Sequence, residues 1–234
     1  MIRERRLEPE LMDQPDLDPV KHRNALLGLR RINVLSRSAA IMWPEIATVA
    51  HRVHPRTLRV LDLACGGGDN AIALAARGRQ AGVSIEIHGC DISPLAVAVA
   101  RQHAEVSGAK NVGFSLLDAL KEPLPCGYDV VSCSLFLHHL DESQASHLLG
   151  KMADAAAELV LVNDLQRSWF GLGLAWIGCR LLTRSPVVHV DGPRSVAAAF
   201  AVSEIGSLAG RSGLDGATIS QHWPQRWLLA WRKQ

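Results

Sequence analysis

An apolar stretch that runs directly into three consecutive glycines constrains the fold of this chain more than any other feature. Residues 59–63, Arg-Val-Leu-Asp-Leu, have the apolar character of a buried strand, and glycines occupy positions 66–68. Glycine permits positive φ angles and lacks the Cβ atom that would hold a ligand away from the backbone. Asn70 then opens an alanine-rich segment typical of a helix, whose first N–H groups are free to face a ligand. This pattern predicts a strand, turn and helix that bind a nucleotide-type cofactor.

A second predicted strand ends at an acidic residue. Residues 84–90 have strand character, and Asp91 follows them, 23 residues beyond Gly68. The carboxyl ends of the first two strands of a doubly wound sheet lie side by side, so the Asp91 carboxylate is placed to accept both hydroxyls of a ribose. The dinucleotide fingerprint G-x-G-x-x-G is not matched, because Ala71 and Ile72 follow the turn. This spacing disfavours a nicotinamide cofactor.

Three motifs in this order resemble those of class I S-adenosylmethionine-dependent methyltransferases: Asp62-Leu-Ala-Cys-Gly-Gly-Gly68, then Asp91-Ile-Ser, then Leu117-Asp-Ala119. The resemblance covers about residues 57–231, and Ala64 stands at the first glycine position of the family's first motif, which is a common variant. It implies S-adenosylmethionine as the cofactor and S-adenosylhomocysteine as the product.

The same resemblance implies which residues hold this cofactor. The backbone of residues 64–68 would lie along the methionine moiety, Asp91 would hold the ribose, and Ile92 would pack on the adenine face. Asp118 and Ala119 would meet the adenine, although a loop carboxylate such as Asp118 can also be a helix cap. The residues carried over as cofactor-binding are Asp62, Ala64, Cys65, Gly66, Gly68, Asn70, Asp91, Ile92, Asp118, Ala119 and Ser134.

The remaining pattern predicts one α/β domain over residues 1–234. Further strands are expected at 128–134, 158–162, 217–222 and 226–232, and helices at 143–157 and 201–212. The resemblance implies a Rossmann-like, doubly wound sheet of seven strands in the order 3-2-1-4-5-7-6, with the last strand antiparallel. Two segments flank this core: a helical N-terminal lid at 1–55 and a cap insertion at 165–195, after the fifth strand.

The two flanking segments are expected to select the substrate. In the lid, apolar residues from Ala25 to Leu35 predict an amphipathic helix and Pro44 is expected to begin another, either over the cofactor or against the sheet edge. In the cap, the uncharged run between Arg167 and Arg180 is rich in Trp and Leu but is shorter than the roughly 20 residues that span a bilayer. It could line an apolar pocket, lie at a membrane interface or pack against a second subunit, and a pocket or dimer wall is favoured.

Histidines supply the candidate bases. A sulfonium methyl is already activated, so the protein must mainly align the acceptor and exclude water, and a histidine helps when the acceptor is a phenol or an enol. His138 and His139 follow the fourth strand. Adjacent side chains are expected to point in different directions, so His139 is preferred to His138 as the residue that faces the acceptor. His189, with Asp191 two residues later, is a second candidate, and a structural role remains open for all three.

Metal and disulfide chemistry are not expected. Asn163 and Asp164 end the fifth strand, but the end of the fourth offers only Ser132 and Ser134, whereas metal-dependent catechol-type enzymes need carboxylates on both. Five cysteines without a C-x-x-C pair indicate neither a zinc site nor a disulfide framework.

The composition and charge of the chain exclude some classes of binding partner. A formal net charge of +2 with scattered basic residues does not indicate nucleic-acid binding, and the Asn/Asp-Pro-Pro-aromatic run of base-methylating enzymes is missing after the fourth strand. With 48% hydrophobic and 21% charged residues, disorder is expected only within about the first dozen positions. The charged N-terminus lacks the apolar core of a secretory signal, which favours the cytoplasm.

The predicted function is S-adenosylmethionine-dependent methyl transfer to a small apolar or aromatic acceptor, on oxygen rather than carbon. His-His-Leu at 138–140 resembles the segment that small-molecule methyltransferases of quinone and polyketide pathways often carry after the fourth strand. A role in secondary metabolism is therefore expected. The alternatives are a protein methyltransferase, a non-catalytic S-adenosylmethionine-binding protein and, less favoured, a nicotinamide oxidoreductase.

Overall fold

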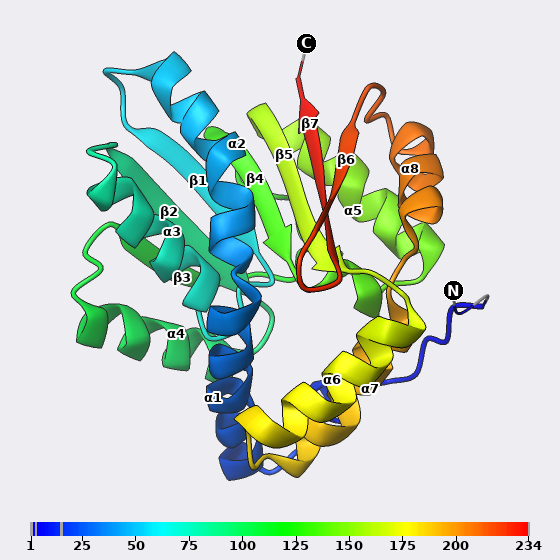
Figure 1. The fold of residues 1–234 in the computed structure, drawn as a ribbon. Helices are drawn as coiled ribbons and strands as arrows, with labels where there is room; N and C mark the ends of the chain where they lie inside the picture. Colours follow the sequence, from blue (N-terminus) through cyan, green and yellow to red (C-terminus); the bar gives the residue numbers. More distant parts are fainter. Residues whose placement is uncertain (1, 3, 15, 234) are drawn as a thin grey trace.

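The described part of the chain folds around a seven-stranded sheet. A computed structural model describes residues 2, 4–14 and 16–233. The strand order is β3-β2-β1-β4-β5-β7-β6, with β7 antiparallel to both β5 and β6, as expected from the sequence (Figure 1). The strands are β1 (Leu58–Leu63), β2 (Ile85–Asp91), β3 (Val112–Leu116), β4 (Tyr128–Ser134), β5 (Ala156–Leu165), β6 (Thr218–His222) and β7 (Arg226–Arg232).

Both faces of the sheet are buried under helices. Leu58 and Val60 of β1 pack into one apolar cluster with three helices, whereas Leu61 and Leu63 pack into a second cluster with two others. This alternation follows from the opposite directions of successive side chains in a strand. The first face carries α2 (Ser38–Val53), α3 (Asp69–Gln80) and α4 (Pro94–Ser107), and the second carries α5 (Glu142–Ala155) and α8 (Val202–Arg211).

Two boundaries differ from the sequence-based expectation. The helix expected to begin at Pro44 begins at Ser38, and the proline lies inside α2. Proline removes only one helical hydrogen bond, and the buried face with Ile41, Met42 and Ile46 continues across it, so packing outweighs the local penalty. The helix expected to reach residue 157 ends at Ala155, because Ala156 already pairs with β4 as the first residue of β5.

Three helices lie beyond the carboxyl ends of the parallel strands. These are α1 (Pro19–Ser36), α6 (Trp169–Leu182) and α7 (Pro186–Ala198), which Figure 1 shows grouped below the sheet. The last two form the expected cap insertion. Two short 3₁₀ helices, η1 (Leu11–Asp13) and η2 (Leu137–His139), face this region. Within the described ranges, no helix is both long and apolar enough to cross a membrane.

The N-terminal segment is ordered where it is described, against the expectation of disorder over the first dozen residues. The Asp191 carboxylate of α7 accepts hydrogen bonds from the backbone N–H groups of Leu11 (2.9 Å) and Met12 (3.0 Å). Arg5 donates Nη2 hydrogen bonds to the carbonyls of His138 (3.0 Å) and Leu140 (2.6 Å). These tertiary contacts hold residues 4–14 across the end of the sheet.

Candidate active site

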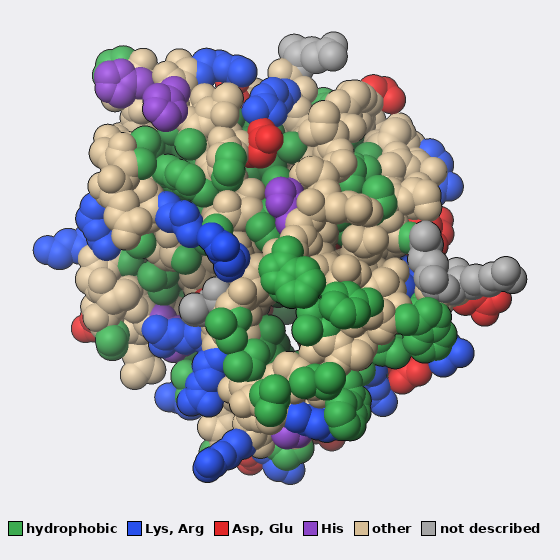
Figure 2. Space-filling model, in the orientation of Figure 1, with side chains coloured by type: hydrophobic (Ala, Val, Ile, Leu, Met, Phe, Trp, Pro, Cys, Tyr) green, Lys and Arg blue, Asp and Glu red, His purple; other side chains and the backbone are tan. Residues whose placement is uncertain are grey.

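A cavity of about 1200 Å³ lies at the carboxyl ends of the strands, where an open α/β sheet is expected to bind ligands. Its walls come from the glycine turn, the ends of β2, β4 and β5, and one side of α1 and α6. Figure 2 shows hydrophobic side chains gathered beside a hollow on this face. The sequence-predicted residues that line it are Asp62, Ala64, Cys65, Gly66, Asn70, Asp91, Ile92, Asp118, Ala119, Ser134, His138 and His139.

The glycine turn needs glycine for two different reasons. Gly66 has a φ of 53°, and a Cβ built on it would meet no atom within 4 Å, so this position leaves room for a ligand on the cavity side. Gly68 has a φ of 77°, but its Cβ would lie 2.6 Å from the Phe114 ring and 2.9 Å from the Ala100 Cβ. Gly68 is not among the residues that line the cavity, and its missing side chain makes room for Phe114. Its contact with the cofactor stays a prediction.

This difference predicts that two alanine substitutions differ in their effect on cofactor binding. Gly68→Ala should destabilise the fold by roughly 1–3 kcal/mol through overpacking beside Phe114, in addition to the backbone strain of its positive φ. Gly66→Ala should cost only about 1–2 kcal/mol of backbone strain but should also weaken the binding of S-adenosylhomocysteine, because its methyl group enters the cavity. Thermal unfolding and calorimetric titration of both variants measure the two effects. If Gly66→Ala and Gly68→Ala lost the same affinity for S-adenosylhomocysteine at the same loss of stability, the two glycines would not have different roles.

Asp91 connects the turn to the end of β2. Its Oδ2 accepts a hydrogen bond from the Gly66 N–H (2.8 Å), and its Oδ1 accepts one from the Ser93 N–H (2.9 Å). Burial raises the pKa of this carboxyl group above its usual value. Ile92, the next residue, is 65% exposed on the cavity wall, where a flat ring could lie on it.

Asp62 and Asp118 are held differently. Asp62 is buried beneath the turn and accepts a hydrogen bond from the Ser132 hydroxyl (2.9 Å), and burial raises its pKa to about 6. Asp118 accepts hydrogen bonds from the N–H groups of Leu120 (3.0 Å) and Lys121 (3.2 Å), so it caps its own loop while lining the cavity. The Ser134 hydroxyl accepts a hydrogen bond from the Asn163 amide (3.0 Å).

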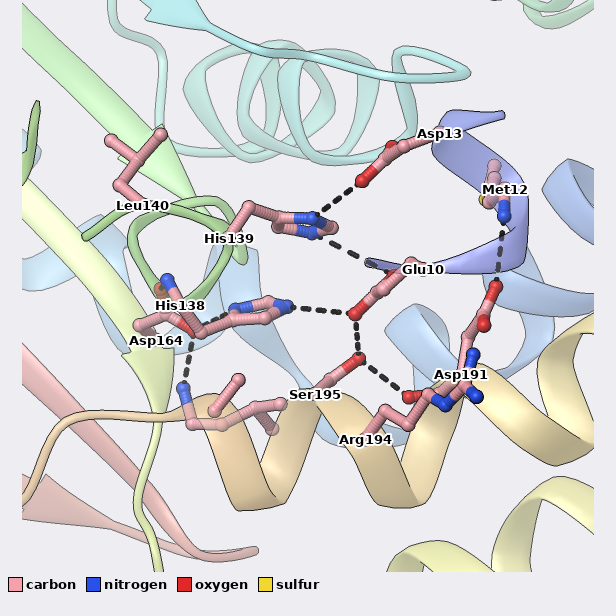
Figure 3. A network of polar contacts seen from close by, with 12 residues as sticks. Glu10, Met12, Asp13, His138, His139, Leu140, Asp164, Asp191, Arg194 and Ser195 are labelled. Carbon is pink, nitrogen blue, oxygen red and sulfur yellow. Dashed lines mark hydrogen bonds and ion pairs between the residues drawn. The ribbon is translucent and has the colours of Figure 1, made fainter. Parts of the chain in front are cut away.

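His138 is buried between two carboxylates. Its Nδ1 lies 2.7 Å from Asp164 Oδ1, and its Nε2 lies 3.7 Å from Glu10 Oε1 (Figure 3). Burial lowers the pKa of His138, but Asp164 and Glu10 outweigh burial and raise this pKa to about 10. At neutral pH, His138 is therefore an imidazolium and not a free base.

His139 faces the same carboxylate from the other side. Its Nδ1 lies 2.9 Å from Asp13 Oδ2 and its Nε2 lies 3.8 Å from Glu10 Oε2. Both imidazoles point toward Glu10, with ring centroids 4.3 Å apart (Figure 3). The expectation that adjacent histidines diverge is wrong here, because both rings turn toward the Glu10 carboxylate of the N-terminal segment.

Glu10 joins the two histidines into one network. It also accepts a hydrogen bond from the Ser195 hydroxyl of α7. Burial raises the pKa of Glu10, but its contacts with His138 and His139 outweigh burial and lower this pKa, which keeps Glu10 ionised. Sequence reasoning missed Glu10 and Asp13 because both lie in the segment expected to be disordered.

His189 does not form the expected pair with Asp191. Its Nε2 lies 2.8 Å from the Thr183 carbonyl oxygen, whereas the Asp191 carboxylate binds the backbone of η1. His189 is not among the residues that line the cavity. Two residues apart in a helix, the side chains of His189 and Asp191 leave on different faces, which accounts for the separation.

Known proteins resemble this chain in both sequence and fold. The family described as "Methyltransferase domain" matches residues 60–158. The chain carries a class I S-adenosylmethionine-dependent methyltransferase domain. Such domains take S-adenosylmethionine as cofactor, and the cavity residues from Asp62 to Ala119 lie where that cofactor is expected.

Curated relatives of this methyltransferase domain come from quinone pathways. The ubiquinone biosynthesis O-methyltransferase of Azoarcus sp. is 30% identical over 165 residues, covering 69% of this chain and 66% of that protein. The demethylmenaquinone methyltransferase of Deinococcus radiodurans is 36% identical over 135 residues, covering 56% and 52%. The chain spans about half to two thirds of the length of these two relatives.

Solved structures confirm the methyltransferase fold at low sequence identity. An O-methyltransferase from neocarzinostatin biosynthesis, bound to S-adenosylhomocysteine and 1,4-dihydroxy-2-naphthoic acid, matches with a TM-score of 0.65 and 17% identity, covering 92% of this chain and 58% of that one. Magnesium protoporphyrin IX methyltransferase from Synechocystis PCC 6803 with bound S-adenosylhomocysteine matches with a TM-score of 0.57 and 20% identity, covering 94% and 90%.

Proposed function

We propose that this protein transfers the methyl group of S-adenosylmethionine to a hydroxyl oxygen of a small, largely apolar or aromatic acceptor, such as a phenol, an enol or a quinone-like or polyketide-like metabolite. The observation that carries this proposal is the placement of His138 and His139 in the same cavity as the cofactor turn. A cavity with both a cofactor turn and an imidazole network suits an acceptor that loses a proton.

The cofactor supplies an activated methyl group, and the chain's own residues position and deprotonate the acceptor. His139 is the proposed base. Its Nδ1 is occupied by Asp13, so its Nε2 is the nitrogen left to receive a proton on the Glu10 side. His138, already protonated, holds Glu10 on one side and is oriented by Asp164 on the other.

The apolar side of α6 supports a small hydrophobic acceptor. Leu174, Ala175 and Leu182 of this helix line the cavity. Apolar walls exclude water and hold a flat substrate near the cofactor, which is the main catalytic demand of methyl transfer. The names of the relatives, which refer to ubiquinone and demethylmenaquinone, agree with an acceptor of this kind.

Methyl transfer from a labelled cofactor tests the proposal. Purified protein is expected to label catechols, hydroxyquinones or hydroxynaphthoic acids, and the label should appear as a methyl ether by mass spectrometry. Label on protein bands would favour a protein methyltransferase. Cofactor binding without transfer to any of these acceptors would favour a non-catalytic binding protein.

The same assay tests whether transfer is independent of metal, as the sequence predicts. Ligand atoms of Glu10, His138 and His139 lie within 4.8 Å of one another, which is close enough to hold an ion. The charge on His138 balances this cluster without one, so a chelator such as EDTA is expected to leave turnover unchanged. Loss of turnover that returns when a divalent metal is added would instead make this cluster a metal centre.

A further inference from the structure

Arg226 is a buried cation whose charge the fold leaves without a full set of partners. It is the first residue of β7, lines the cavity and is only 2% exposed. Among the described residues, its Nε and Nη1 atoms have no hydrogen-bond partner. A buried guanidinium without hydrogen bonds is costly, so such a group calls for a ligand.

The nearby acid does not satisfy Arg226. The Asp164 carboxylate is held by other groups: its Oδ1 lies 2.7 Å from His138 Nδ1 and accepts a hydrogen bond from the Leu165 N–H (2.6 Å), and its Oδ2 accepts one from the His138 N–H (3.1 Å). Neither Nε nor Nη1 of Arg226 donates a hydrogen bond to it. Burial lowers the pKa of Arg226 to about 10, and Asp164 opposes this effect only in part. Arg226 therefore stays positively charged at neutral pH.

The position of Arg226 assigns it to the acceptor side of the cavity. Since β7 is antiparallel, it begins at the edge where the parallel strands end, and Arg226 pairs with Leu165 at the end of β5. Two strands, β4 and β5, separate β7 from β1, which carries the cofactor turn. With strands about 4.8 Å apart, Arg226 lies roughly 14 Å across the sheet from β1.

The backbone around Arg226 is fixed on both sides. The Gln225 carbonyl accepts a hydrogen bond from the Gln166 N–H (2.9 Å), and Trp227 is fully buried. The guanidinium is therefore presented to the cavity by a rigid strand end, which lowers the entropic cost of binding an anion.

We propose that Arg226 binds a carboxylate of the acceptor, so that the substrate class is a hydroxylated aromatic acid. The hydroxyl group of this substrate class rests on the proposed function. The carboxylate group is inferred from Arg226 alone. Carboxylate oxygens accept the N–H groups that the fold leaves unpaired. Glu10 and Asp13 also face the cavity, and both would repel an acid that had no local cation to receive it.

Calorimetric titration of the full chain saturated with S-adenosylhomocysteine tests the proposal without any methyl transfer. The probes are an ortho-hydroxynaphthoic acid and its amide, which share shape and hydroxyl group but differ in charge. The wild type should bind the acid about tenfold or more tighter than the amide, the effect expected of a charge-assisted hydrogen bond. In Arg226→Gln this preference should vanish, through weaker binding of the acid. Arg37→Gln, which removes an exposed cation from the same cavity, should keep it.

Three results would overturn the proposal. The first is that Arg226→Gln weakens the binding of the acid and of the amide equally. The second is that the wild type does not prefer the acid. The third is that Arg226→Gln loses affinity for S-adenosylhomocysteine, which would assign Arg226 to the cofactor. Arg226→Met distinguishes ligand binding from a role in folding. If the charge of Arg226 does not stabilise the fold, the unfolding temperature of this variant should not fall. Preferred binding of the acid without methyl transfer would retain this proposal and reject the proposed function.

Discussion

Asp91→Ala is expected to weaken the binding of S-adenosylmethionine by roughly 1.5–3 kcal/mol, which is about one to two orders of magnitude in the dissociation constant. The Asp91 carboxylate accepts a hydrogen bond from the Gly66 N–H of the glycine turn, at 2.8 Å. Each carboxylate oxygen has a second lone pair that can accept a ribose hydroxyl. The substitution would therefore remove the predicted ribose contact and loosen the turn in one step. Calorimetric titration with S-adenosylmethionine measures the loss.

Asp91→Asn and a stability measurement separate these two effects. The asparagine keeps one carbonyl oxygen, so it can accept from either the Gly66 N–H or the Ser93 N–H, but not from both. Its affinity should lie between those of the wild type and Asp91→Ala. Thermal unfolding without cofactor shows how much of the loss belongs to the turn. An unchanged dissociation constant in Asp91→Ala would reject the ribose assignment.

His139→Gln is expected to lower turnover by about a hundredfold or more while leaving the affinity for S-adenosylhomocysteine nearly unchanged. Glutamine can keep a hydrogen bond to Asp13, but it cannot take a proton from the acceptor at neutral pH. Steady-state kinetics with a phenolic acceptor, together with calorimetry, measure the two quantities. Turnover equal to that of the wild type would return His139 to a structural role.

His138→Gln is the matched comparison, because His138 acts through its positive charge. Its pKa in the folded protein, about 10, lies above the value near 6.5 expected in the unfolded chain. Its protonation therefore stabilises the fold fully below about pH 6.5, and this contribution is lost as the pH rises through about 10. His138→Gln should cost more stability near pH 6 than near pH 10, measured by urea unfolding. A cost independent of pH would contradict the buried imidazolium.

The cofactor half of the site could be predicted from the sequence because its determinants are local. The strand at β1, the glycine turn and the start of α3 are consecutive, and Asp91 ends the strand that pairs with β1 in parallel. A parallel sheet brings the carboxyl ends of neighbouring strands together whatever the surrounding packing. Gly68 is the exception, since only the packed Phe114 ring shows that its missing side chain serves the core.

The side of the cavity that carries His138, His139 and Arg226 depended on contacts between distant segments. Asp13 meets His139 across 126 positions of sequence, and the charged segment that carries it has no periodicity from which an ordered structure could be predicted. In the sequence, Arg226 is an ordinary residue of a predicted strand, and only the packed structure shows that it is buried and lines the cavity.

The sequence by itself predicted the strands and the cofactor turn, because hydrophobic periodicity and glycine chemistry act over a few residues, and the order of the strands followed from the resemblance to the methyltransferase family. The tertiary structure alone decided the charges around His138 and His139. Glu10 reaches His138 and His139 only because Asp191 and Ser195 of α7 hold the N-terminal segment in place. Burial then sets the protonation of these groups, and burial is a property of the whole packed chain that no local pattern encodes.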